Sequence, residues 1–313
     1  MTIIWPNRKE FAFSIVDDTD FATVKNVKPI YDYLYDKGIK TTKTVWCYPS
    51  RDKYSGESLS DLNYRIFIKS LYENGFEIAF HGVGSGEFKR QEIESGLQLF
   101  HDIIGSYPKM YINHASNPEG LYWGNKRFSI PLKQIYDLIK VFLGKPSVVT
   151  SGEDEDSKFF WGDYAKEHIK YIRNRVFSGI NTFKYDPYMP YIEESKKYSN
   201  YWFSSSDGYN CRKFNSLLSQ KNINKLVSEN GCAIIYTHFA YDFIEKDGNL
   251  NKSFIEAMDY ISELNGWFAP ASEILDYIQQ QRDNDKNIKN VASIKMDCRW
   301  ACERAIRKVV WRV

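Results

Sequence analysis

Short apolar runs alternate along this chain with longer stretches in which apolar residues recur every three or four positions. The short runs predict buried strands and the longer stretches predict amphipathic helices. The predicted strands cover residues 11–16, 41–48, 76–80, 109–113, 147–150, 201–205, 232–236 and 266–268. The predicted helices cover residues 23–37, 58–72, 89–104, 132–143, 222–229, 252–264 and 272–281. Between 151 and 206 the pattern is weaker and indicates a helix at 164–173 and a strand at 181–185.

This alternation of strand and helix predicts an α/β fold, because parallel strands need a crossover helix between them. Such strands form either a doubly wound open sheet or a closed barrel. Seven or eight strand–helix units in one chain favour the barrel, so we expect a distorted (β/α)7–8 barrel. We place it at residues 1–288 as a single domain, followed by a C-terminal tail at 289–313.

The tail differs in composition from the rest of the chain. It holds seven basic residues against two acidic ones, with apolar residues interspersed. This pattern predicts a basic amphipathic helix. One interpretation is that the helix lies on an anionic membrane surface. The other is that it packs on its own barrel or on a second subunit.

Composition narrows the class of protein. The chain has 313 residues, 43% of them apolar and 26% charged, which is typical of a soluble globular protein. A net charge of +2 does not indicate nucleic-acid binding. The five cysteines form no CxxC pair, and we interpret them as free thiols in a reducing compartment. Since no secretory signal or transmembrane run is visible, we expect a cytoplasmic protein, with peripheral contact to the inner face of the membrane through the tail.

Polar residues follow several of the predicted strands directly. Three acids within four residues end the first strand, beginning with Asp17 and Asp18, and His81, His114 and His238 each stand at the end of a later strand. The acids alone could belong to a solvated loop. However, three of the five histidines in the chain occupy equivalent places, and the carboxyl ends of barrel strands meet at one rim. We therefore expect these side chains to form one site.

This set of residue types suits metal-assisted hydrolysis. An aspartate and two histidines commonly bind Zn²⁺ or another divalent metal and leave positions open for water and substrate. A neighbouring aspartate can take a proton from the water, and a further histidine can protonate the leaving group. These groups together can hydrolyse an amide or an ester.

The order of these motifs resembles the polysaccharide deacetylases, the NodB-like family of carbohydrate esterases. The paired Asp17-Asp18 after a buried strand resembles the first motif, which reads roughly Thr-Phe-Asp-Asp-Gly. Residues 77–81 look like the lead-in to the second motif, a histidine followed four residues later by another. Residues 234–238 resemble the late Leu-x-x-His motif, and 266–274 resemble the last strand and the start of the last helix. The resemblance extends from Phe11 to about Ile278.

The resemblance implies a divalent metal, with Zn²⁺ as the first choice and Mn²⁺, Co²⁺ or Ni²⁺ as alternatives. It gives Asp17 the role of general base, Asp18 and His81 those of metal ligands, and His238 that of general acid. Two departures stand out: Ser85 occupies the place of the second ligand histidine, and residues 111–114 replace the third motif, normally Arg-x-Pro-x-Gly. We expect His114 to supply the missing ligand.

The implied activity is removal of an acyl group from an N-acylated amino sugar. The substrate would be a precursor of surface polysaccharide or lipopolysaccharide, linked to a nucleotide or a lipid. The alternative is a catalytically impaired carbohydrate-binding or scaffold protein that keeps the deacetylase fold. Four residues are expected to contact substrate: Asn113, Asp207, Trp123 and Trp202. An Asp-Gly turn would equally explain Asp207, and a core position would equally explain Trp202.

Overall fold

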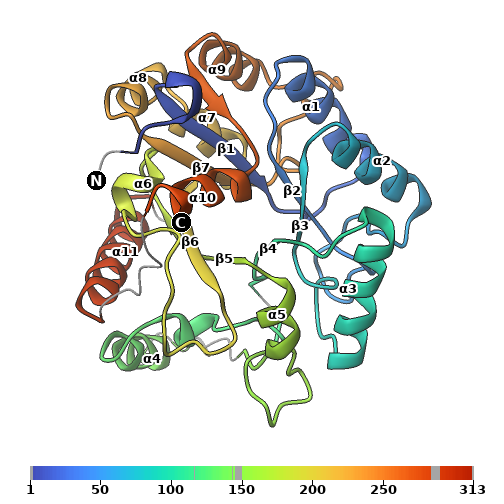
Figure 1. Cartoon of the computed structure of the whole chain (residues 1–313), viewed down its shortest axis with the longest axis vertical. Coiled ribbons are helices and arrows are strands. Elements are labelled where there is room, and N and C mark those ends of the chain that lie inside the picture. The colour runs from blue at the N-terminus through green and yellow to red at the C-terminus, as the bar shows by residue number, and fades with distance from the viewer. Residues whose placement is uncertain (1–2, 116, 143, 145–149, 283–289, 312–313) are drawn as a thin grey trace.

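A barrel of parallel strands forms the centre of the molecule, with helices around it (Figure 1). The computed structural model describes residues 3–311 except 116, 143, 145–149 and 283–289. Its strands are β1 (Phe11–Asp17), β2 (Thr42–Val45), β3 (Glu77–Phe80), β4 (Met110–Tyr111), β5 (Tyr171–Phe177), β6 (Tyr201–Asp207), β7 (Cys232–Thr237) and β8 (Gly266–Phe268). Within the described residues, β2 to β7 pair in sequence order, β7 pairs with β1, and a β1–β2 pairing closes the ring. The predicted fold class is confirmed.

The eighth strand lies beside the barrel and does not complete an eight-stranded ring. It pairs with the first three residues of β1, Phe11–Phe13, whereas β2 pairs with the last two, Val16 and Asp17. Two strands therefore share one edge of β1. The fit is close, because a Cβ on Gly266 would lie 2.4 Å from the ring of Phe11. The barrel is therefore distorted from a regular eight-stranded one: seven of the described strands close the ring, and β8 occupies part of an edge of β1 outside it.

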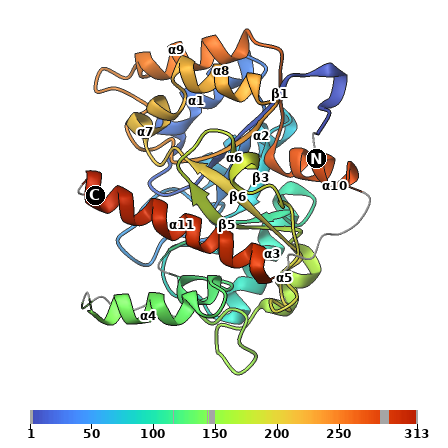
Figure 2. The same ribbon diagram turned by 90° about the vertical axis from the view of Figure 1, so that its left-hand side faces the viewer.

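The helices lie between successive strands and at the end of the chain (Figures 1 and 2). They are α1 (Val24–Asp36), α2 (Leu62–Glu73), α3 (Arg90–Ile104), α4 (Leu132–Phe142), α5 (Gly162–His168), α6 (Thr182–Tyr185), α7 (Cys211–Leu217), α8 (Gln220–Ser228), α9 (Lys252–Ser262), α10 (Ala271–Gln280) and α11 (Asn290–Trp311), with short 3-10 turns η1 (Pro6–Arg8) and η2 (Gly124–Arg127). The periodic apolar residues predicted to face the core do so. In α1, for example, Val27, Ile30 and Leu34 are buried.

Two predicted elements between 151 and 206 are wrong. The helix predicted at 164–173 ends at His168, and β5 begins at Tyr171. The strand predicted at 181–185 is the short helix α6. The sequence concealed β5 because Arg173, Asn174 and Arg175 are all buried in it, and apolar patterning cannot identify such a strand. The strand predicted at 147–150 falls largely on residues 147–149, which lie outside the described part of the chain.

The tail forms the long helix α11, and its described side chains pack against the barrel. Met296 is buried in the main core, and Trp300 packs with Phe128 and Phe177 in a smaller cluster. Asp297 is fully buried and accepts a 2.8 Å hydrogen bond from Nε of Arg175 on β5. These contacts agree with the interpretation that the tail covers its own barrel. Among the described helices, α11 included, none has the length and apolarity needed to cross a membrane.

Candidate active site

One aspartate and two histidines converge at the carboxyl ends of β1, β3 and β4. Oδ1 of Asp20 lies 3.6 Å from Nε2 of His81 and 3.3 Å from Nε2 of His114. All three side chains are buried, and their facing atoms lie within 4.8 Å of one another. The sequence analysis anticipated both histidines at this rim. It gave no role to Asp20, the third acid after β1.

These three residues fit a divalent metal ion. Asp20 Oδ1 is buried and has no hydrogen-bond partner among the described residues. Nδ1 of His81 lies 3.0 Å from the carbonyl oxygen of Ile112, and Nδ1 of His114 lies 3.0 Å from Oδ1 of Asn117. Each Nδ1–H can therefore donate away from the site, which leaves the Nε2 lone pair facing Asp20. Bonds of about 2.0–2.1 Å in a tetrahedral zinc site put neighbouring ligand atoms about 3.4 Å apart, close to the separations seen.

Asn117 holds His114 and ties two rim loops together. Its Oδ1 also accepts a 2.9 Å hydrogen bond from the backbone of Gly86, and its Nδ2 donates to Gly84 O at 2.8 Å and to Glu119 Oε1 at 2.9 Å. Ser85, which stands where the family has its second ligand histidine, lies in the same loop. Its hydroxyl is 3.4 Å from Nδ1 of His114, the nitrogen that faces away from Asp20. Ser85 thus supports the ring of His114 from behind.

Asp18 lies beside this cluster and is bound by an arginine. Both oxygens of its carboxylate accept hydrogen bonds from Arg173 on β5, at 2.9 and 2.6 Å. Its Oδ2 is 3.9 Å from Nε2 of His81. The guanidinium of Arg173 also stacks over the ring of Tyr236, 4.4 Å from the ring centre. A bidentate guanidinium fixes a carboxylate in orientation.

His238 follows β7 and contacts Asp20 from another side. Its Nε2 lies 3.1 Å from Asp20 Oδ2, and its Nδ1 lies 2.9 Å from the carbonyl oxygen of Tyr209. Both partners are acceptors, so the ring carries a proton on each nitrogen in this arrangement. Burial by itself would lower the pKa of His238. The hydrogen bond to Asp20 and the nearby negative charges outweigh this effect, so the net pKa lies above the ordinary 6.5. Burial by itself would raise the pKa of Asp20, but the surrounding imidazoles of His114, His238 and His81 hold it far below its usual range.

Asp17 is not part of this cluster. Its Oδ2 lies 2.9 Å from Nζ of Lys43 and accepts a 3.0 Å hydrogen bond from Tyr31 on α1, and its Oδ1 accepts from the backbone of Phe239 at 2.8 Å. The carboxylate is fully buried. Successive side chains of a strand point to opposite sides, so Asp17 faces the helix layer. The structure places Asp20 where the sequence analysis expected Asp18, and Asp18 where it expected Asp17.

Two of the residues expected to contact substrate are occupied elsewhere. The side-chain oxygen of Asn113 accepts a 2.8 Å hydrogen bond from the backbone N–H of Leu121, and its Nδ2 donates to the carbonyl oxygen of Leu121 at 3.1 Å. These two bonds fix the loop after β4. Trp202 is fully buried near the start of β6, away from the rim, and donates to Ser199 Oγ at 2.8 Å. Both side chains thus have structural partners within the protein, and their roles toward substrate stay predictions.

The other two expected contacts, Asp207 and Trp123, are partly exposed. Asp207 is the last residue of β6, and its carboxylate lies 3.8 Å from Nζ of Lys213. The guanidinium of Arg127 lies 3.9 Å from the ring centre of Trp123. Their roles toward substrate stay predictions.

Aromatic side chains that the sequence analysis did not single out surround the histidines. Trp46, at the end of β2, lies parallel to His81 with ring centres 6.4 Å apart, and Tyr54 meets His114 edge-on at 4.8 Å. Tyr209 and Tyr241 contact the ring of His238 at 5.0 and 4.6 Å. The strand predicted at 41–48 enclosed Trp46, and only the structure shows that β2 ends at Val45, so the sequence pattern offered no signal for Trp46.

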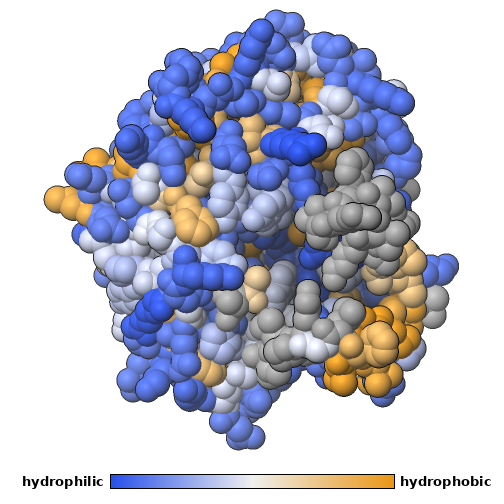
Figure 3. All heavy atoms as spheres, turned by 180° about the vertical axis from the view of Figure 1, so that it is seen from behind, coloured by the Kyte–Doolittle hydropathy of each residue, from blue (hydrophilic) through white to orange (hydrophobic). Residues whose placement is uncertain are grey.

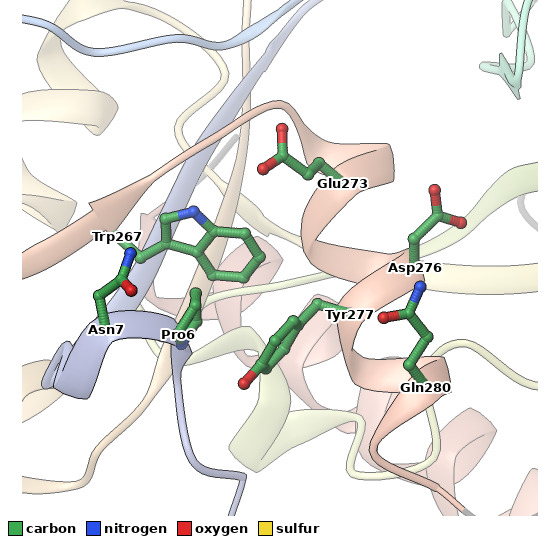
Figure 4. A pocket seen from close by; sticks show the side chains of 7 residues that line it. All are labelled: Pro6, Asn7, Trp267, Glu273, Asp276, Tyr277 and Gln280. Atoms are coloured by element: carbon green, nitrogen blue, oxygen red, sulfur yellow. The ribbon is translucent and has the colours of Figure 1, made fainter.

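The barrel presents this rim to a hollowed face of the molecule. Figure 3 shows the face onto which the carboxyl ends of the strands open, and it is hollowed near its centre. A separate pocket of about 410 Å³ lies at the other end of the barrel, between η1, β8 and α10 (Figure 4). Trp267 and Tyr277 line it together with Glu273 and Asp276. It is distinct from the histidine cluster.

Comparison with known proteins supports the fold. No family model matches the chain, and no curated protein matches it in sequence. Among solved structures, it is similar to a PuuE allantoinase, with a TM-score of 0.55 and 12% identity over 90% of this chain and 94% of that one. It is also similar to a probable polysaccharide deacetylase from Pseudomonas aeruginosa PAO1, with a TM-score of 0.54 and 10% identity over the same shares. The chain therefore has the fold of the polysaccharide deacetylases, as the sequence resemblance implied.

Proposed function

We propose that this chain is a metal-dependent hydrolase that removes an acyl group from an N-acylated amino sugar. One observation carries the proposal: Asp20, His81 and His114 face one point, with Asp18 and His238 beside it. The fold shared with a deacetylase and an allantoinase supports hydrolysis of a carbon–nitrogen bond. As substrate we propose a precursor of surface polysaccharide or lipopolysaccharide, carried on a nucleotide or a lipid.

The donor set suggests which metal the site would hold. Two imidazole nitrogens and one carboxylate oxygen, with remaining positions open, are typical of catalytic Zn²⁺, and Mn²⁺, Co²⁺ or Ni²⁺ are alternatives. When bound, the metal would supply Lewis acidity to the acyl carbonyl and to water. The Nδ1 bonds of both histidines fix their rings for this purpose.

We assign the proton transfers to Asp18 and His238. Asp18 accepts a proton from the attacking water, because a carboxylate oxygen already bonded to Arg173 keeps a further lone pair. His238 donates the Nε2 proton to the sugar nitrogen as the carbon–nitrogen bond breaks. The products are a free carboxylic acid and an amino sugar. The roles expected of Asp17 and Asp18 thus pass to Asp18 and Asp20.

The alternative is a carbohydrate-binding or scaffold protein whose metal site is incomplete, because Ser85 replaces the second ligand histidine of the family. Nε2 of His114 lies 3.3 Å from Asp20 Oδ1, which supports His114 as the replacement. This distance favours the enzyme over the scaffold.

Metal binding tests the proposal directly. We expect the purified protein to hold about one Zn²⁺ per chain by elemental analysis, and its melting temperature to fall when a chelator removes the metal. Asp20→Asn and His114→Ala should each lose the metal. His101→Ala is the matched control, since His101 lies on the exposed side of α3, and it should keep the metal. Full metal content in His114→Ala would contradict the proposed site.

A further inference from the structure

Helix α4 exposes an apolar stripe that a globular protein normally turns inward. Ile135, Leu138, Ile139 and Phe142 follow one another at intervals of three, one and three residues and so share one face of the helix. They are 47%, 69%, 52% and 91% exposed. Val141, at 78%, extends the stripe. A single exposed leucine needs no explanation, but a continuous helical face does.

The side of α4 next to the stripe makes the contacts that hold the helix in place. Leu132 and Tyr136 pack on the small cluster of Phe128, Phe177 and Trp300, the last of which comes from α11. The helix is therefore fixed with its stripe outward.

The stripe belongs to the same side of the molecule as the candidate active site. In Figure 2, α4 and α11 both extend toward the side where the strands end, away from η1 and α10. Figure 3 shows the resulting hydrophobic area at the lower right of the hollowed face, where α4 stands. An apolar surface at this place would bring whatever it contacts close to the mouth of the site.

Basic side chains lie near the stripe on the neighbouring helix. Arg299 and Arg304 are exposed on α11, whereas Lys133 and Lys140 of α4 lie on the side of the helix away from the stripe and are half-buried. The one acid of α4, Asp137, accepts hydrogen bonds from Asn125 at 2.9 and 3.0 Å. An exposed apolar face with cationic side chains nearby is the pattern of surfaces that lie in the interface of an anionic bilayer.

From these observations we propose that α4 is a membrane-docking helix, which inserts its apolar stripe into an anionic lipid surface and turns the mouth of the barrel toward the lipids. A stable contact with a second protein buries about 800 Å² and about 20–30 residues on each side, which one short helix does not offer. A bilayer accepts a single helix. The docking of α4 does not depend on the proposed function. Only its consequence, that the amino-sugar substrate is lipid-linked, rests on the proposed function.

Vesicle binding tests the docking helix. The probes are vesicles of phosphatidylglycerol and phosphatidylcholine in equal parts, and vesicles of phosphatidylcholine alone. We expect the full chain to sediment with the first kind and less with the second, and high salt to weaken the binding. The double variant Leu138→Glu/Ile139→Glu should bind at least about tenfold more weakly, because two apolar side chains no longer leave water. Ile66→Glu on α2, where Ile66 is 60% exposed, is the matched control and should bind like the unchanged protein.

Each outcome decides for or against the docking helix. Loss of binding in the double variant alone supports it. Absent binding by the unchanged protein, or equal binding by the double variant, overturns it. A dimer in light scattering that the double variant dissociates, without vesicle binding, also overturns it and assigns the stripe to a second copy. Chelated protein should bind vesicles as before, so a failure of the hydrolase proposal leaves this result unaffected.

Discussion

Three aspartates within four residues lie in three different surroundings. Asp17 pairs with Lys43 under α1, Asp18 pairs with Arg173, and Asp20 faces His81 and His114. The sequence placed the cluster at the right rim because strand ends can be recognised. It treated the first two acids as a pair, whereas in the structure Asp17 ends β1 and Asp18 and Asp20 lie in the loop beyond it. Arg173 could not be foreseen, since its partner lies 155 positions away in the sequence.

Replacing Asp18 tests its role as the proton acceptor. In Asp18→Asn the side chain keeps its shape but cannot take a proton, so we expect the turnover number to fall about 10²–10⁴-fold. Metal content should stay at the level of the unchanged protein, because Asp20 and the two histidines remain. Elemental analysis and the rate of acetate release from an N-acetylated sugar measure the two quantities. Loss of the metal would instead make Asp18 a ligand.

Asn117 tests whether the orientation of His114 matters. Asn117→Ala removes the acceptor of the His114 Nδ1 proton and frees the loop at Gly84 and Gly86. We expect the affinity for Zn²⁺ to fall about 10–100-fold, as measured by competition with a chelator of known affinity. Asn125→Ala, on η2, is the control and should leave the affinity unchanged. An unaltered affinity in Asn117→Ala would mean that packing alone orients the ring.

At the scale of elements, β5 links the active site to the C-terminal helix. Arg173 reaches inward to Asp18, and Arg175, two residues on, binds Asp297 of α11 at 2.8 Å. The regular strands and helices were predictable because their apolar residues follow a period of two or 3.6. Strand β5 was not predictable, because its buried charges are neutralised by acids from distant parts of the chain.

Asp297→Ala tests the link between β5 and α11. It leaves the guanidinium of Arg175 buried without its main partner, so we expect the free energy of unfolding to fall by about 3–5 kcal/mol. Urea denaturation measures this loss, and hydrogen exchange should show α11 opening first. Glu256→Ala removes an exposed ion pair with Lys252 and should cost less than about 1 kcal/mol. Equal small losses in both variants would show that α11 is not anchored by this pair.

At the scale of the whole molecule, closure of the barrel was the step that patterning could not decide. An open sheet and a barrel use the same strands and helices. They differ only in whether the first and last strands of the ring order, here β2 and β1, also pair with each other. The β1–β2 pairing at Val16 and Asp17 closes it. The stability of this closed structure should also depend on pH through one buried acid, Glu119.

Burial raises the pKa of Glu119 from 4.5 to about 8. The folded protein therefore keeps a proton between these pH values that the unfolded chain has lost, so stability falls as pH rises through this window and levels off above it. Each pKa unit corresponds to about 1.4 kcal/mol. Glu119→Gln should remove this slope and be the more stable protein at about pH 8, by urea denaturation, with little difference at about pH 5. Parallel pH profiles for the two proteins would contradict the assignment.

The position of β1 in the ring has a consequence for how the protein is made. This first strand leaves the ribosome early, yet its partner β7 lies more than 200 residues further along, and 218 positions separate His238 from Asp20. At about 5–20 residues per second, roughly 10–40 seconds pass before the two can meet. During that interval β1 is an apolar strand without its partner β7, and Asp20 lacks the contact with His238. All three proposed metal ligands are synthesised by residue 114, but the complete active site can exist only after β7 and His238 have followed, so the onset of hydrolysis would report that the barrel has closed.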